Sequence, residues 1–173
     1  MNYFEFYELP LSFFVDEKAL KRKYYQKSRD YHPDFFAQQG AELQEEALQL
    51  STYNNEAYKA LKTLDGRIKY VLTLKGKLVE GERYQLPQQF LLAMMDINEA
   101  LMELEFDFDA STHQSLVQQL QELEDALLTE VADTLEKYDD TTENSANLEK
   151  VKEFYYKKRY LLRISKSLNK FAV

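Results

Sequence analysis

The sequence predicts an all-α protein made of two helical modules. The chain of 173 residues contains only four glycines and three prolines, which argues for long helices with few turns rather than for sheets. Apolar side chains recur at spacings of three and four residues along most of its length, which is the period of an amphipathic helix. Hydrophobic residues make up 45% and charged residues 30% of the chain, as in an ordinary soluble globular protein.

Four helices are expected in the N-terminal module. They cover about residues 2–8, 16–31, 41–63 and 65–75. Asp16 is the N-cap candidate of the second helix, and Gly76 ends the fourth. The third helix presents one apolar stripe to the core: Leu43, Ala47, Leu50, Tyr53 or Asn54, Ala57, Leu61 and Leu64.

Three longer helices are expected in the C-terminal module, over about residues 87–105, 111–138 and 145–171. The breaks between them fall at "DFDAST" and "DDTTENS", which are rich in Asp, Ser and Thr. Three helices with short connections pack best as an antiparallel bundle. The sequence therefore predicts a module of residues 1–75, a linker of 76–86, and a three-helix bundle of 87–173 with Pro87 at its first helical position.

The net charge of −8 is distributed unevenly. Residues 96–149 hold 16 acidic side chains and one basic side chain, whereas residues 150–170 hold eight basic and one acidic. An acidic surface repels phosphate groups, so no nucleic-acid partner is expected. Within the bundle, the basic last helix is expected to lie beside two acidic helices and to neutralise them.

The chain contains no cysteine, which excludes disulfides and thiolate metal sites. Its longest apolar run, "FLLAMM", is far shorter than a membrane span, and no signal-peptide pattern is visible after Met1. No membrane association is expected. A cytoplasmic location is the simplest interpretation, with a processed mitochondrial form as the alternative.

The second helix has two contrasting faces. Steps of 100° per residue put Leu20, Tyr24, Ser28 and Tyr31 on the core side. The opposite side carries Lys18, Arg22, Tyr25 and Arg29. Residues 18–29 hold six basic side chains and no acidic ones, which indicates either a surface for an acidic partner or a solvated face.

The triplet His32-Pro33-Asp34 follows this basic helix. Pro33 has no N–H and moves His32 out of the α region, so the helix is expected to end near Tyr31. An imidazole and a carboxylate are thereby held in one turn. The triplet is a helix stop, a fragment of a catalytic or metal site, or a docking point, and the residues alone leave these alternatives open.

The helix over 87–105 carries more apolar side chains than its core stripe needs. That stripe is Phe90, Met94, Ile97, Leu101 and Leu104, whereas Leu91, Leu92, Met95 and Met102 lie roughly 100–200° from its centre. Asp96, Glu99 and Glu103 border this surplus. The surplus is either an exposed partner site with an acidic rim or, on one flank, core against the third helix of the bundle.

Catalysis by this chain alone is not expected. No serine nucleophile with a plausible base can be named. The two histidines, His32 and His113, are too far apart in the sequence for a metal signature, and there is no glycine-rich phosphate loop. No catalytic residue, metal ligand or cofactor site is therefore assigned.

Residues 1–75 resemble a J-domain, the DnaJ-type module that stimulates heat-shock ATPase chaperones of the DnaK class. The resemblance is carried by "YFEFYELP", by "LKRKYYQKSRDYHPDFF" and by "NNEAYKALKTLDGRIKYVL". The whole chain resembles the HscB-type co-chaperone of iron–sulfur cluster assembly, which joins such a J-domain directly to an acidic three-helix bundle. The C-terminal likeness rests on this architecture and on "QFLLAMMDINEALMELE".

This resemblance implies two partners. A DnaK/HscA-type ATPase chaperone would contact His32, Pro33, Asp34, Lys18, Arg22 and Arg29, with the carboxylate of Asp34 paired to an arginine of the partner. An IscU-type cluster scaffold protein would contact Leu91, Leu92, Met95, Asp96, Glu99, Glu103 and Tyr156. Phe35 stands where the family usually has Lys, and the cysteine-rich extension of some eukaryotic members is absent. A monomer or weak dimer is expected.

The expected function is that of an adaptor. The bundle would hold the scaffold protein while the J-domain presents it to the ATPase chaperone and triggers ATP hydrolysis. One alternative is a J-domain co-chaperone that serves other clients in general protein folding. Another, of a different class, is a small metal-dependent hydrolase that uses His32 and Asp34.

Overall fold

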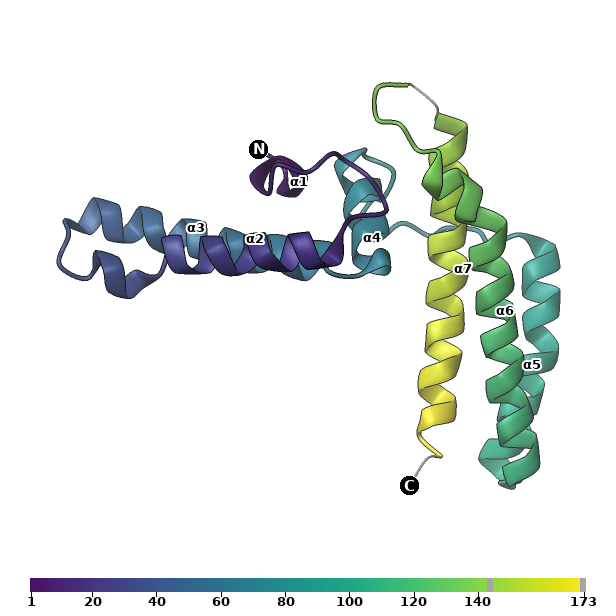
Figure 1. The fold of residues 1–173 in the computed structure, drawn as a ribbon. Coiled ribbons are helices and arrows are strands. Elements are labelled where there is room, and N and C mark those ends of the chain that lie inside the picture. The colour runs from purple at the N-terminus through teal and green to yellow at the C-terminus, as the bar shows by residue number, and fades with distance from the viewer. Residues whose placement is uncertain (143–144, 172–173) are drawn as a thin grey trace. The chain divides into compact units, whose positions relative to one another are not determined.

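The computed structural model describes residues 1–142 and 145–171. Within these ranges it contains seven α-helices, one short 3₁₀ helix and no strand, which confirms the all-α class (Figure 1). The elements are α1 (Tyr3–Phe6), α2 (Glu17–Asp30), η1 (Pro33–Phe36), α3 (Ala41–Leu61), α4 (Leu64–Leu74), α5 (Gln88–Phe106), α6 (Ala110–Glu136) and α7 (Ser145–Asn169). Residues 143–144, inside the predicted break "DDTTENS", and residues 172–173 lie outside the described part.

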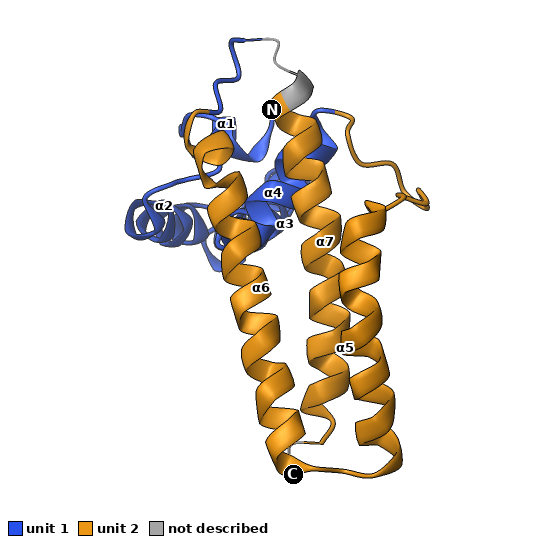
Figure 2. Ribbon diagram, turned by 90° about the vertical axis from the view of Figure 1, so that its right-hand side faces the viewer, with its two compact units in different colours: residues 1–75, 138–143 blue, residues 76–137, 144–173 orange. Residues whose placement is uncertain are grey.

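The chain divides into two compact units (Figure 2). Unit 1 comprises residues 1–75 and 138–143, and unit 2 comprises residues 76–137 and 144–173. The segment from Tyr138 thus belongs to unit 1, where its ring lies 5.0 Å from the ring of Phe13. None of the described helices is long and apolar enough to cross a membrane.

Unit 1 is built on α2 and α3, which pack side by side and are joined through η1 (Figure 1). Its buried hydrophobic side chains come from all four helices and from the segment after α1: Phe4, Phe6, Tyr7, Phe13, Leu20, Ala47, Ala57, Leu61, Ile68, Val71 and Leu72. On α2, Leu20 is buried, whereas Lys18, Arg22, Tyr25 and Arg29 are exposed, as the two-faced pattern predicts. α4 packs against α3 and closes the unit.

Two helix starts and one apolar position are informative. Asp16 caps α2 by accepting a hydrogen bond from the Ala19 N–H at 3.0 Å, which confirms the predicted N-cap. Pro87 is the N-cap of α5 rather than its first helical residue. The assignment of Leu43 to the core stripe of α3 was wrong, since this side chain is exposed. Leu43 lies at the start of α3, which packs against η1. The side chains of η1 are mostly exposed, so they form no core for Leu43 to enter.

Unit 2 contains α5, α6 and α7, which pack against one another (Figure 2). Their shared core includes Met94, Ile97, Leu101, Leu104, Leu116, Leu120, Leu161, Ile164 and Leu168. The core stripe predicted for α5 is therefore confirmed, with Phe90 partly buried at its start. Ion pairs join α7 to the segment before α5, through Lys152 with Glu82 and Glu149 with Lys77.

Candidate functional site

The turn between α2 and η1 is closed by its own backbone. His32 has φ −67° and ψ 127°, the extended conformation that a following proline favours. The His32 carbonyl accepts a hydrogen bond from the Phe35 N–H at 3.0 Å, and His32 Nδ1 accepts one from the Asp34 N–H at 3.3 Å. These bonds and the fixed φ of Pro33 hold the triplet in one conformation.

The side chains of His32 and Asp34 lie beside each other at the surface. His32 Nδ1 is 3.5 Å from Asp34 Oδ2, and the Asp34 side chain is 87% exposed. An Nδ1 that accepts a bond from the backbone N–H carries no proton, so in this tautomer the His32–Asp34 contact is not a salt bridge. The carboxylate of Asp34 is therefore presented to solvent. Among the described residues, no three His, Asp or Glu side chains gather as a metal ion would require.

Two glutamines fix the segment that follows this turn, and the sequence interpretation missed both. Gln44 Nε2, on the first turns of α3, donates to the Gln39 carbonyl at 2.7 Å and to the Ala37 carbonyl at 3.4 Å. Gln39 Nε2 donates to the Phe35 carbonyl at 3.4 Å. The end of η1 is thus tied to α3. A glutamine in the first turns of a helix is too common to signal this role, because its partners are backbone carbonyls that the sequence does not display.

The basic face of α2 runs up to this turn. Lys18, Arg22 and Arg29 are all exposed, as a docking surface and a solvated face both require. Two other lysines of the helix serve unit 1 itself. Lys23 Nζ lies 3.5 Å from Glu8 Oε2, and Lys27 Nζ lies 4.4 Å from the centre of the Phe6 ring.

Phe35 adds an apolar side chain to the same surface. It is 68% exposed, and its ring meets the His32 ring edge-on at 6.1 Å between centroids. An exposed aromatic ring on a braced turn is typical of a contact residue, because little side-chain entropy is lost when a partner covers it.

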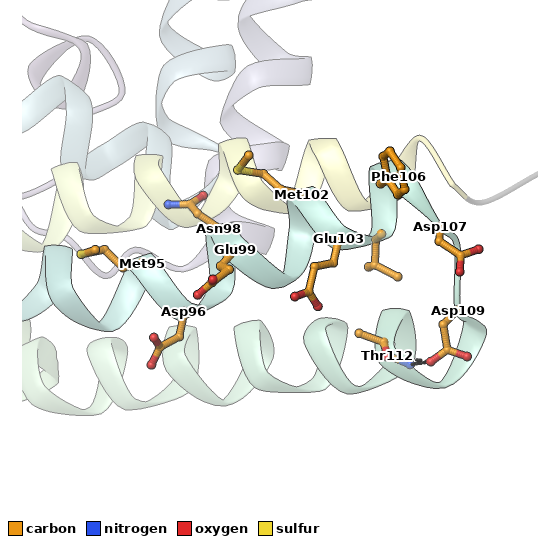
Figure 3. Close-up of a pocket in the computed structure, with 11 residues that line it drawn as sticks. Met95, Asp96, Asn98, Glu99, Met102, Glu103, Phe106, Asp107, Asp109 and Thr112 are labelled. Carbon is orange, nitrogen blue, oxygen red and sulfur yellow. Dashed lines mark hydrogen bonds between the residues drawn. The ribbon is translucent and has the colours of Figure 1, made fainter.

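A second candidate surface lies on α5. Leu91, Leu92 and Met95 are exposed, and the acidic side chains of Asp96, Glu99 and Glu103 are exposed beside them. The alternative in which these apolar residues are core is therefore excluded for this surface. Met95 and the three acids line a groove of about 950 Å³ that continues to the α5–α6 turn (Figure 3).

Tyr156 makes its contacts elsewhere. Its hydroxyl donates to Glu82 Oε2 at 3.2 Å, and its ring stacks on that of Tyr84 with centroids 4.5 Å apart. Burial raises the pKa of Tyr156, whereas the hydrogen bond from Lys152 lowers the pKa of Glu82. Tyr156 is thus held against the segment before α5 and does not line the groove that Met95 lines.

Comparison with known proteins gives a consistent result. Residues 86–169 match the family model described as the HSCB C-terminal oligomerisation domain. The chain is 34% identical over 167 residues to the co-chaperone protein HscB homolog of Pseudoalteromonas atlantica, covering 95% of each chain. It is 36% identical over 117 residues to the human iron-sulfur cluster co-chaperone protein HscB, covering 67% of this chain and 50% of the human one. The crystal structure of human HscB superposes with a TM-score of 0.82 at 28% identity, covering 100% of this chain and 84% of that one.

Proposed function

The chain belongs to the HscB co-chaperone family, and from that premise we propose that it is an adaptor between two proteins. It binds the iron–sulfur cluster scaffold protein, delivers this client to a DnaK/HscA-type ATPase chaperone and stimulates the hydrolysis of ATP by that chaperone. Cluster assembly and transfer are assisted as a result. The chain itself performs no chemistry in this scheme, because the bond that breaks lies in the nucleotide of the partner.

In this proposal, three consecutive segments of the chain have different roles. Residues 1–75 act as the J-domain, residues 76–86 as a linker, and residues 87–173 as the client-binding bundle. The observation that supports this proposal best is the exposed carboxylate of Asp34, held on a turn that is closed by the hydrogen bonds of the His32 carbonyl and His32 Nδ1 to backbone N–H groups. A carboxylate fixed in this way is suited to a paired, charge-assisted hydrogen bond with an arginine.

Two further sets of residues complete the proposal. Lys18, Arg22 and Arg29 extend the ATPase-binding surface along α2, with His32 and Pro33 beside Asp34. On unit 2, the scaffold protein is bound by Leu91, Leu92, Met95, Asp96, Glu99 and Glu103, with Tyr156 from α7. Exposed apolar side chains with a charged border favour a specific protein partner over random hydrophobic contact.

The test is the stimulation of a purified DnaK/HscA-type ATPase in single-turnover assays. Asp34→Asn keeps the turn and removes the charge, so we expect stimulation to fall roughly tenfold or more, the effect of losing one charge-assisted hydrogen bond. Asp30→Asn, an exposed carboxylate at the last residue of α2, is the matched control and is expected to stay active. Full activity of Asp34→Asn would refute the proposal.

The alternative function is that of a general co-chaperone for other clients. A pull-down experiment distinguishes it from the proposed binding of the scaffold protein. Immobilised scaffold protein should retain the wild-type chain and lose Leu92→Ala/Met95→Ala, while both stimulate the ATPase equally in the absence of client. A wild-type chain that stimulates the ATPase and ignores the scaffold protein would favour the general co-chaperone.

A further inference from the structure

The exposed apolar side chains of α5 continue beyond the proposed client surface, which is the face with Leu91, Leu92 and Met95. Met102 is 69% exposed and Phe106 is 97% exposed. At 100° per residue, positions 91, 95, 102 and 106 fall within about 60° of one another, so they form one stripe. The stripe is about 22 Å long, at 1.5 Å per residue. Met95, Met102 and Phe106 lie along the groove that ends at the α5–α6 turn (Figure 3).

Phe106 does not contribute to the core of unit 2, because its side chain is almost fully exposed. Phe108, two residues later, closes the end of the bundle, since its ring stacks on Phe171 at 5.6 Å and lies 5.7 Å from His113. His113 in turn contacts the Leu168 carbonyl through Nε2 at 3.0 Å. The neighbouring aromatic residue is therefore structural, whereas Phe106 is presented to solvent. An exposed phenylalanine that belongs to a larger exposed apolar stripe is typical of a partner site.

All the ionisable side chains that line this groove are acidic. They are Asp96, Glu99, Glu103, Asp107 and Asp109. Asp109 is also the N-cap of α6, where its carboxylate accepts hydrogen bonds from the Thr112 N–H at 2.9 Å and from the Thr112 hydroxyl at 2.6 Å. A purely apolar partner would bury these carboxylates without compensation, so the complementary partner is cationic.

We propose that the distal groove, defined by Met102, Phe106, Asp107 and Asp109, binds a basic segment of the client that carries an apolar anchor. The inference rests on the proposed function, because the client is the scaffold protein, and it adds the chemistry and the extent of the bound segment. The client surface and the distal groove together form the stripe of 22 Å, which accommodates about fifteen residues of helix or about seven residues of extended chain. Lysine or arginine side chains of this segment face the acidic border, and an apolar side chain covers Phe106.

The experiment measures the affinity of the scaffold protein for the full chain by calorimetry at low and moderate salt. Met102→Ala/Phe106→Ala is expected to weaken binding roughly tenfold, as for the loss of a buried aromatic anchor. Asp107→Asn is expected to weaken binding at low salt and to flatten its salt dependence. Leu128→Ala/Leu162→Ala, which removes two partly exposed leucines outside the groove, is the matched control and should bind within twofold of wild type.

The possible outcomes separate the inference from the function. If the wild-type chain does not bind the scaffold protein, the proposed function fails. If the wild-type chain binds and both groove variants bind equally well, the distal groove is not a client site while the function stands. The other candidate occupant of the groove is a second copy of this chain, and light scattering detects it. If the groove variants abolish self-association and leave the affinity for the scaffold protein unchanged, a second copy covers Phe106 and the inference is overturned. Phe106→Ser alone, at a 97% exposed position, repeats the test should the double variant lose its fold.

Discussion

Asn54 is a fully buried polar residue in the middle of α3, and its hydrogen bonds explain how the core accommodates it. Its Oδ1 accepts a bond from the Tyr7 hydroxyl at 2.7 Å, and its Nδ2 donates to the Tyr24 carbonyl at 3.1 Å and to Ser28 Oγ at 3.0 Å. Burial raises the pKa of Tyr7, which keeps its hydroxyl a donor. The sequence left Tyr53 or Asn54 open at this position of the stripe, because helical period does not reveal partners on α1 and α2.

We predict that Tyr7→Phe lowers the free energy of unfolding by about 1–3 kcal/mol, because it leaves Asn54 Oδ1 buried without its donor. Tyr24→Phe is the matched control. The Tyr24 hydroxyl donates to Asn55 Oδ1 at 3.0 Å at an exposed site, where water replaces the lost partner, so a loss below about 1 kcal/mol is expected. Urea unfolding of both variants checks this. Equal losses would show that the buried bond has no special role.

The junction of α3 and α4 depends on a close backbone approach. Thr63 caps α4 by accepting a bond from the Gly66 N–H at 3.1 Å, and a Cβ at position 66 would overlap the carbonyl of Ala60. Arg67, only 3% exposed, donates to the carbonyls of Phe13 and Leu61, each at 2.7 Å. Burial lowers the pKa of Arg67. The first turn of α4 therefore satisfies carbonyls of two other segments.

Gly66→Ala should destabilise unit 1, although alanine normally stabilises a helix interior by about 1 kcal/mol relative to glycine. The new methyl group meets a backbone carbonyl that cannot move without disturbing α3, and a loss of about 1–3 kcal/mol is expected, as for overpacking. Gly40→Ala is the control, because open space surrounds that position. Thermal unfolding measures both variants. A more stable Gly66→Ala protein would contradict the described junction.

The contact between α7 and the segment before α5 should depend on pH. Lys152 Nζ lies 2.7 Å from Glu82 Oε1. This bond lowers the pKa of Glu82 and raises the pKa of Lys152. A lowered carboxyl pKa gives stability that is present above the unfolded value, about 4.3, and is lost as pH falls through the folded value. A raised lysine pKa gives stability that is present below about 10.4 and is lost as pH rises through the folded value.

We therefore expect Glu82→Gln to be less stable than wild type between about pH 5 and pH 10, and the difference to shrink on either side of this window. Urea unfolding from pH 3 to pH 11 measures it. Asp133→Asn serves as the control, because its bond to Lys137, the C-cap residue of α6, joins two exposed side chains and contributes little. A stability difference that persists unchanged at pH 3 would indicate that packing, rather than the ion pair, is responsible.

Over the whole molecule, charge is segregated between the two modules. Residues 1–75 hold 11 basic and 11 acidic side chains, so the excess of acid lies entirely in residues 76–173, with 11 basic and 19 acidic. Within the balanced part, the bases are concentrated on the exposed face of α2. The proposed ATPase partner and the proposed client therefore meet surfaces of opposite sign, which disfavours exchange of the two binding sites.

Stimulation of the ATPase should weaken as salt rises, because Lys18, Arg22 and Arg29 are exposed and their attraction to a partner is screened. Titrating the chain into the ATPase assay at several salt concentrations gives the half-maximal concentration at each. Phe35→Lys adds one charge beside the turn and is expected to steepen this dependence, while Phe35→Ala leaves the slope unchanged. Indifference to salt between low and moderate ionic strength would argue against the role of the three basic residues.

Local features of the fold were readable from the amino-acid order. Helix periods, the Asp16 cap, the stop at Pro33 and the core stripe of α5 all depend on neighbours within one or two turns, which the sequence displays directly. The family resemblance, read from the same residues, is confirmed by the comparisons. The residues proposed to bind partners remain predictions.

Other features appeared only with the packed structure. These features are hydrogen bonds that join a side chain to a group elsewhere in the chain, in most cases many residues away. They are the bonds of the buried Asn54, those of Arg67 and Gln44 to backbone carbonyls, and that of Tyr156 to Glu82. Leu43 is the opposite case to the buried Asn54. It is an apolar residue at a position that fits the helical period of the core stripe, but its helix turn has no core opposite it. Periodicity says which way a side chain faces along its own helix, whereas what it meets there is set by how the helices pack.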